Sequence, residues 1–221
     1  MKKNTPWLVI TGLDGSGKTG LVDRLEKFLS EELNLRVKRT RSPHDKYLIQ
    51  DLLNVSGDGE PMKDRYTDRL IFALDNRILG TRIRQWQRSG DYDIILSQRG
   101  FFDSFVHGSV QGYTYEQIAT LNQIDDLPKC TVMIHLCADH NIAYARIKDD
   151  PDADKFETSA YMRRQEEETR RGYRELTQAH NPDLSAFEGI QNFFIDTTEL
   201  SPNETFDLAK RRLSEFLQNL K

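Results

Sequence analysis

The stretch that decides the fold is Gly12-Leu13-Asp14-Gly15-Ser16-Gly17-Lys18-Thr19. It fits the phosphate-loop pattern G-x-x-x-x-G-K-[ST]. The apolar residues 7–11 precede it and predict a β-strand, while residues 18–33 carry apolar side chains at helical spacing. A strand before the pattern and a helix after it form the context that a phosphate loop requires. Chance would place the pattern in about one chain in a hundred of this size, so the stretch predicts a phosphate-binding site.

The residue types in this loop suit a nucleoside triphosphate and its metal ion. Glycines let the loop curl, so that successive backbone N–H groups point at phosphate oxygens, and the following helix adds its N-terminal partial charge. Lys18 supplies a full charge that can follow the γ-phosphoryl group, and the Thr19 hydroxyl can bind Mg²⁺. We therefore predict that ATP and Mg²⁺ bind at Gly12, Gly15, Ser16, Gly17, Lys18 and Thr19.

Short apolar runs alternate with helical patterns along the chain, which favours an α/β fold with a parallel sheet and crossover helices. The predicted strands are residues 7–11, 35–39, 93–97, 131–136 and 192–195. A length of 221 residues suits one sizeable core, so we expect a single domain over residues 1–221.

The remaining segments predict helices and a lid. Residues 63–88 carry Leu70, Leu74, Ile78 and Ile83 at helical spacing, and we expect this stripe to face the core. Residues 158–178 are dominated by charge, and we expect that helix to be largely solvated. Residues 149–154 are rich in helix breakers and predict a lid, which we place at about residues 147–157.

Composition argues against several classes of partner. The 31 basic and 35 acidic residues leave a formal charge of −4, so no global field attracts nucleic acid or an anionic membrane. The apolar run at residues 7–10 is too short for a signal peptide or a membrane span. Cys130 and Cys137 suit neither a disulfide framework nor a metal site. We therefore expect a cytoplasmic protein that binds neither nucleic acid nor membrane.

Blocks spread over nearly the whole chain resemble the thymidylate kinase family, in that family's order. The phosphate loop is the first block. The second, at residues 39–43, is similar to the family's threonine-arginine-glutamate-proline segment, and the third is the helix at residues 72–77. Residues 96–100 stand at the family's aspartate-arginine motif, and residues 136–173 resemble its lid and the helix behind it. No single block after the phosphate loop is specific to the family. The order and spacing of the blocks carry the resemblance.

The resemblance implies ATP-dependent phosphorylation of a nucleoside monophosphate, with dTMP or a related pyrimidine deoxynucleotide as the acceptor. It also implies a five-stranded, doubly wound parallel sheet of the P-loop kinase type: a three-layer sandwich with helices on both faces and a lid, usually in a homodimer. By position, Asp14 would contact the acceptor sugar. Arg41 and Arg99 would hold the acceptor phosphate, which planar guanidinium groups bind through paired hydrogen bonds. Phe72 would stack on the base and Arg77 would read it. The expected catalytic residues are Lys18, Arg99 and Asp14.

Gln98 departs from the family pattern, because it stands where the family has an aspartate. A carboxylate there helps to hold Mg²⁺ and its waters, whereas a neutral amide offers a weaker oxygen and no charge. Asp103, four residues after Arg99, is the nearest carboxylate that could compensate, and Asp14 is the other candidate. We expect Asp103 to lie in the acceptor site.

Two further departures concern the base and the donor. Phe72 and Arg77 are five residues apart, where the family's pair is four apart, which rotates one of them off the shared helical face. Gly15 supplies no arginine toward the donor, so a lid cation must replace it. The lid offers Arg146, Lys148 and Lys155, of which we expect Arg146 to contact ATP.

Two other functions remain open from the sequence. A kinase that phosphorylates a hydroxyl of a nucleoside or small metabolite would need a base, and Asp14 or Asp103 would have to serve. The pair Arg41 and Arg99 argues against it, since two cations suit an anionic acceptor. A nucleotide-binding regulator that lacks turnover is the other alternative, and Gln98 is the reason to consider it.

Overall fold

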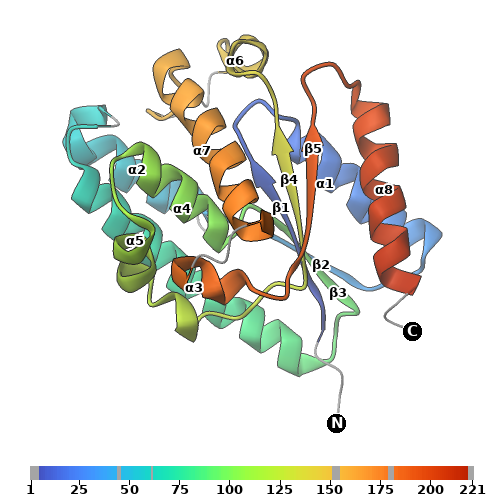
Figure 1. Cartoon of the computed structure of the whole chain (residues 1–221). Helices are drawn as coiled ribbons and strands as arrows, with labels where there is room; N and C mark the ends of the chain where they lie inside the picture. The colour runs from blue at the N-terminus through green and yellow to red at the C-terminus, as the bar shows by residue number, and fades with distance from the viewer. Residues whose placement is uncertain (1–4, 44–45, 61, 151–154, 179–181, 219–221) are drawn as a thin grey trace.

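Five parallel strands form one sheet in the order β2-β3-β1-β4-β5, in a computed structural model that describes residues 5–43, 46–60, 62–150, 155–178 and 182–218 (Figure 1). The strands are β1 (Trp7–Gly12), β2 (Val37–Arg41), β3 (Ile94–Gln98), β4 (Val132–Cys137) and β5 (Gln191–Asp196). Each strand begins and ends within two residues of its predicted bounds. The predicted α/β fold with a five-stranded parallel sheet is confirmed.

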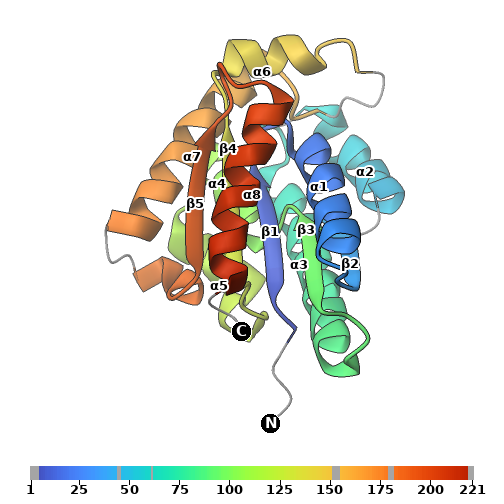
Figure 2. The ribbon, with the colours of Figure 1, turned by 90° about the vertical axis from the view of Figure 1, so that its right-hand side faces the viewer.

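Helices cover both faces of this sheet, as the two views in Figures 1 and 2 show. The helices are α1 (Lys18–Lys27), α2 (Lys46–Val55), α3 (Arg65–Ser89), α4 (Phe101–Val110), α5 (Tyr115–Asn122), α6 (His140–Ile147), α7 (Ser159–Gln178) and α8 (Pro202–Gln218). Short helical turns lie at Phe28–Glu32, Ser56–Gly59, Ile124–Asp126 and Pro182–Phe187. None of the described helices is both long and apolar enough to cross a membrane.

The two faces of the sheet build two separate cores, because neighbouring strand residues point to opposite sides. In β1, Trp7 and Val9 pack with side chains of α3, α4 and α5. Leu8 and Ile10 pack on the other face with α1 and α8. All four side chains are buried, as expected of a central parallel strand that is covered on both sides.

The apolar stripe predicted to face the core on α3 is exposed instead. Leu70, Leu74 and Ile78 are 43%, 55% and 39% exposed, while Ile83 is buried as predicted. The inward face of the first half of α3 carries polar side chains, among them Asp68, Arg69, Asp75 and Asn76. The sequence prediction was wrong because it assumed that the apolar face of a helix is the buried one.

Helix α7 also differs from its prediction as a largely solvated helix. Tyr161, Met162, Gln165 and Thr169 are buried, so this helix presents a continuous inner face and a charged outer one. The run of arginines and glutamates lies mostly on the outer face and hides this amphipathic pattern in the sequence.

The phosphate loop is held against the neighbouring strand by a close backbone approach at Gly12. This residue has a φ of 137°, and a Cβ atom added to it would lie 1.8 Å from the carbonyl oxygen of Leu136. Glycine is therefore required where β1 turns into the loop, since every other residue would force β1 and β4 apart.

We expect Gly12→Ala to lower the free energy of unfolding by about 3 kcal/mol or more, because the new methyl group overlaps backbone that cannot move aside. Gly20→Ala is the matched control, since a Cβ atom at Gly20 meets open space within α1. In that position alanine should stabilise by up to about 1 kcal/mol. Equilibrium denaturant unfolding of both variants measures the difference. Equal stability of the two variants would contradict this account of the loop.

Candidate functional site

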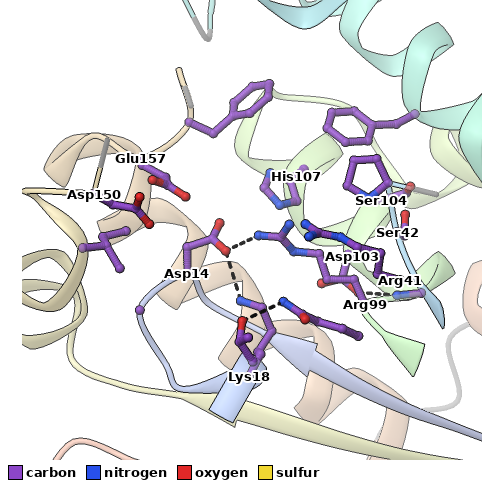
Figure 3. Close-up of a pocket in the computed structure, with 18 of the residues that line it drawn as sticks. Asp14, Lys18, Arg41, Ser42, Arg99, Asp103, Ser104, His107, Asp150 and Glu157 are labelled. Carbon is purple, nitrogen blue, oxygen red and sulfur yellow. Dashed lines mark hydrogen bonds and ion pairs between the residues drawn. The ribbon is translucent and has the colours of Figure 1, made fainter. Parts of the chain in front are cut away.

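A cavity of about 430 Å³ lies at the carboxyl ends of β1, β2 and β3, against the phosphate loop (Figure 3). Open parallel sheets bind ligands at this edge, where the strand order reverses, and here the chain places β3 and β4 on opposite sides of β1. The predicted site residues that line the cavity are Asp14, Gly15, Gly17, Lys18, Thr19, Arg41, Phe72, Arg99, Asp103 and Arg146. Gly12, Ser16 and Arg77 lie outside its lining.

Lys18 lies folded back under the loop and is only 4% exposed. Its Nζ atom donates hydrogen bonds to the carbonyl oxygens of Gly12 and Leu13, each at 2.8 Å, and to Asp14 Oδ1 at 3.1 Å. Burial lowers the pKa of Lys18, and the Asp14 charge partly opposes that effect. The Lys18 side chain is thus fixed against the phosphate loop, where it lines the cavity.

Asp14 binds two cations through the same carboxylate oxygen. Oδ1 accepts hydrogen bonds from Lys18 Nζ and from Arg99 Nη2 (Figure 3). Burial alone raises the pKa of a carboxyl group, but here the charges of Arg99 and Lys18 prevail and hold the pKa of Asp14 well below its ordinary value. Asp14 is therefore ionised and neutralises part of the charge of both partners.

Arg99 follows β3 in an unusual backbone conformation. Its φ is 64°, in the left-handed region that non-glycine residues seldom adopt. Two hydrogen bonds hold it there: its N–H donates to Ile10 O at 2.8 Å, and its carbonyl oxygen accepts from Ser97 Oγ at 2.6 Å. Backbone strain of this kind persists where the surroundings impose it, and here it turns the guanidinium group toward Asp14.

Arg41 brings a second guanidinium group to the same cavity from the end of β2. The side chain is half-buried, and its Nε atom has no hydrogen-bond partner among the described residues. Burial, followed by the like charge of Arg99, lowers the pKa of Arg41. Two arginines that repel each other across a cavity favour an anion between them.

The hydroxyl group predicted to bind Mg²⁺ lies beside the residue that departs from the family. Gln98 Nε2 donates a hydrogen bond to Thr19 Oγ1 at 3.1 Å, and Thr19 is exposed at the cavity. A carboxylate at position 98 would thus lie next to the threonine hydroxyl. One hydroxyl ligand fits Mg²⁺, an ion that keeps several waters and takes its other ligands from phosphate oxygens.

Asp103, considered above as a substitute for the missing carboxylate, is engaged in a different task. Its Oδ2 atom accepts a hydrogen bond from the N–H of Gly100 at 2.9 Å, which caps the N-terminus of α4. Burial raises the pKa of Asp103, although Arg99 and a hydrogen bond from Thr11 oppose that effect. Asp103 therefore borders the cavity chiefly as a helix cap.

Two of the cations considered for the lid lie in different places: Arg146 lines the cavity, and Lys155 is buried. Arg146, near the end of α6, donates from Nη1 to Gly15 O at 3.2 Å and from Nη2 to Thr197 O at 3.0 Å, so it lies directly beside the phosphate loop. Lys155 is 3% exposed and pairs with Asp68 of α3 at 2.7 Å. Of the predicted lid, residues 151–154 lie outside the described residues.

The base-reading arginine predicted at position 77 does not face the cavity. Phe72 lines it, but Arg77 lies elsewhere on α3, with Nη1 3.8 Å from Asp126 Oδ2. The five-residue spacing places the two side chains on different faces of the helix, which was the expected consequence of the departure. The assignment of Arg77 to substrate binding is therefore corrected.

Arg69, Ser104 and His107 are among the lining residues that escaped the sequence prediction. Arg69 precedes Phe72 by three residues, so helical spacing alone could have placed both on one face. Burial, followed by the positive charge of Arg69, lowers the pKa of His107 to about 3, so its ring is neutral. The neutral ring stacks on Phe72 with centroids 5.9 Å apart.

Curated relatives of this chain share a common name. A "Probable thymidylate kinase" of Pyrobaculum aerophilum is 30% identical over 166 residues, which cover 72% of this chain and 78% of the relative. A second of that name, from Metallosphaera sedula, is 29% identical and covers 79% and 80% of the two chains. A "Thymidylate kinase" of Mesoplasma florum is 28% identical over 96% of both chains. No family model matches the chain. The identity with these relatives over most of each chain, together with the phosphate loop and parallel sheet, places this chain in the thymidylate kinase family.

Proposed function

We propose that this protein transfers the γ-phosphoryl group of ATP to the phosphate of a nucleoside monophosphate, with dTMP or a related pyrimidine deoxynucleotide as the acceptor. The observation that carries the proposal is the convergence of Lys18, Arg41 and Arg99 on one cavity. A transfer between two phosphates needs cations for the donor and for the acceptor, and this cavity has both. The names of the relatives favour dTMP as the acceptor.

On the donor side, the backbone of residues 12–19 would bind the ATP phosphates and Lys18 would follow the γ-phosphoryl group. Thr19 and the neighbouring Gln98 are the residues that would hold Mg²⁺, which supplies charge neutralisation at the phosphates. We assign Arg146 to the donor site because it already contacts Gly15 at the loop. Lys155 is excluded by its buried pair with Asp68. Residues 147–157 would form the lid over this site.

On the acceptor side, Arg41 and Arg99 would bind the monophosphate and align one of its oxygens with the γ-phosphorus. The acceptor phosphate is already an ionised nucleophile, so alignment and charge neutralisation suffice without a general base. Asp14 uses Oδ1 for its two cations, and we assign Oδ2 to a hydroxyl of the acceptor sugar. When phosphates arrive, they would take over the neutralisation of Lys18 and Arg99.

Phosphorylation of a neutral hydroxyl is less well supported. Such a reaction needs a base at the acceptor. Asp14 is ion-paired and its pKa is depressed, which makes it a weak base, and Asp103 accepts hydrogen bonds at the start of α4.

A cytoplasmic location accords with the two cysteines, Cys130 and Cys137, which are buried and free of disulfides.

Arg99→Lys tests the assignment of the acceptor phosphate. Lysine keeps the charge but lacks the guanidinium fork, so the KM for dTMP should rise about tenfold or more while the KM for ATP changes little. Steady-state kinetics with dTMP, other nucleoside monophosphates and nucleosides measure this, with Arg212→Lys on the exposed face of α8 as the control. A rise in the ATP KM alone would mean that the two subsites are reversed. Phosphorylation of nucleosides but of no monophosphate would refute the proposed reaction.

Gln98→Asp tests the metal site. An aspartate would place a carboxylate beside the Thr19 hydroxyl, so we expect a lower Mg²⁺ concentration for half-maximal rate and a kcat higher by about ten- to a hundredfold. Asp103→Asn should lower the thermal midpoint by weakening the cap of α4, and leave the Mg²⁺ dependence unchanged. The reverse pattern, with Mg²⁺ dependence lost in Asp103→Asn, would show that Asp103 serves the metal.

We also propose that the exposed stripe of α3 forms a homodimer interface. Tyr66, Leu70, Leu74 and Ile78 recur at four-residue spacing along the outer face of this helix, and Tyr66 is 59% exposed. Solvent-exposed apolar stripes of this kind are unusual on monomers. Because a two-fold axis pairs a helix face with itself, a second copy of this chain suits the stripe, as the family resemblance implies.

Leu74→Glu should convert the dimer to a monomer, because it places a charge in the centre of the stripe where a partner excludes water. Analytical ultracentrifugation at micromolar concentration measures the mass. The control is Leu33→Glu, since Leu33 is 41% exposed at the end of the helical turn after α1, on the opposite face of the sheet. A monomeric wild-type protein, or equal dissociation by both variants, would disprove the interface.

A further inference from the structure

Residues 155–158 lead from the proposed lid into α7 and belong to no helix or strand. The backbone of this segment is therefore not held by the regular hydrogen bonds of a helix or a sheet. Two of its residues, Phe156 and Glu157, nevertheless line the cavity, and Phe156 is only 2% exposed. A residue in the wall of a binding site needs a fixed position, so side-chain contacts must supply it here.

The side chain of Lys155 makes contacts of this kind, although it lies outside the lining of the cavity. It is 3% exposed, and its Nζ atom donates hydrogen bonds to Asp68 Oδ1 at 2.7 Å and to Ser56 O at 2.9 Å. Asp68 is fully buried, and its Oδ2 atom accepts a hydrogen bond from Gln111 Nε2 at 2.9 Å. One ammonium group thus joins the segment to α3, to the turn after α2 and, through Asp68, to the end of α4.

Stability alone does not account for a buried ion pair. Taking two charges out of water costs about as much as their attraction returns, and apolar side chains of similar size often stabilise a core equally well. A buried pair does supply direction, because its N–H groups and oxygen atoms bind only in particular geometries. Direction matters here because Phe156 follows Lys155 immediately in the chain, and Lys155 Nζ lies 5.3 Å from the centre of the Phe156 ring.

Phe156 packs at the end of the cavity that lies away from the phosphate loop. The centre of its ring is 5.9 Å from that of Phe72 and 5.7 Å from that of His107. In Figure 3, His107 and Lys18 lie on opposite sides of Arg99. A shift of Phe156 would therefore alter the acceptor end of the cavity and leave the phosphate loop as it is.

We propose that the ion pair of Lys155 and Asp68 positions Phe156 in the cavity wall, and that the pair thereby sets the affinity for the acceptor nucleotide but not for ATP. This inference rests on the proposed function, which supplies the acceptor. Lys155 and Asp68 are positioning residues, because they act through Phe156 and lie outside the cavity lining. The pair links the end of the proposed lid to the helix that carries Phe72.

Lys155→Met and Asp68→Asn each remove one charge at nearly constant volume, and the double variant removes both. Each single variant leaves a buried charge unpaired and should lower the thermal midpoint, whereas the double variant should recover most of that loss. The affinity for dTMP, measured by calorimetry, should fall about tenfold in all three variants, because each of them lacks the directed contact. The affinity for ATP should change by less than about twofold, since its contacts are made elsewhere.

Lys63→Met and Asp58→Asn are the matched controls, because these two residues form an exposed ion pair beside the same turn after α2. Both controls should keep the wild-type affinities for dTMP and ATP. Hydrogen exchange at the backbone amides of residues 155–158 should become faster in the double variant and stay at the wild-type rate in the controls.

The double variant separates positioning from stability. If it regains dTMP affinity together with its thermal midpoint, the pair is only structural and the inference is overturned. An equal loss of ATP affinity, or an unchanged dTMP affinity in all three variants, overturns it too. If the wild type binds ATP but no nucleoside monophosphate, the proposed acceptor is wrong and the inference falls with it. Should a single variant fail to fold, the double variant alone decides the question.

Discussion

Asp14 carries the interaction on which the whole carboxyl edge of the sheet depends. Lys18, Arg41 and Arg99 converge on one cavity, where their like charges repel. One carboxylate oxygen contacts both Lys18 and Arg99, so the cations stay in place before any anion arrives (Figure 3). The close approach of Gly12 to Leu136 and the left-handed backbone of Arg99 bring these side chains within reach of Asp14. Strain and charge repulsion are thus concentrated where phosphates would relieve them.

Helix α3 has its polar and apolar faces arranged the opposite way from an ordinary amphipathic helix. Its inner face contributes Arg69 and Phe72 to the cavity and Asp68 to the buried pair with Lys155. Its outer face exposes the apolar side chains of Leu70 and Leu74 to solvent, which is unfavourable in a protein that has no partner to cover them. One helix therefore connects the proposed base-binding end, Lys155 of the proposed lid and the proposed dimer interface. The polar inner face is the structural cost of building a substrate pocket on a core helix.

Sequence patterns located the strands and the phosphate loop because both depend on local rules. Each apolar run fixed a strand within two residues, and the loop sequence required a particular backbone path after β1. The family resemblance pointed to Arg41, Phe72 and Arg99, and the lid cations suggested Arg146; all four line the cavity. The misses fell on helices, where a shift of one residue turns a side chain by about 100°. Arg77 points toward Asp126 for this reason, whereas Leu70, Leu74 and Ile78 face outward because the apolar face of α3 is not its buried one.

By itself the sequence determined the fold class, the phosphate loop and the two arginines at the carboxyl ends of β2 and β3. These rest on short-range patterns and on strand ends that meet at one edge of the sheet. Only the tertiary structure decided which charged side chains form ion pairs. Lys155 and Arg69 are both cations in the sequence, yet Lys155 is neutralised by Asp68, while Arg69 forms no ion pair within the part of the chain that the structure describes. The difference arises from how α3 packs against α4 and the segment before α7, because the pairing of a buried charge is set by three-dimensional distance and not by position along the chain.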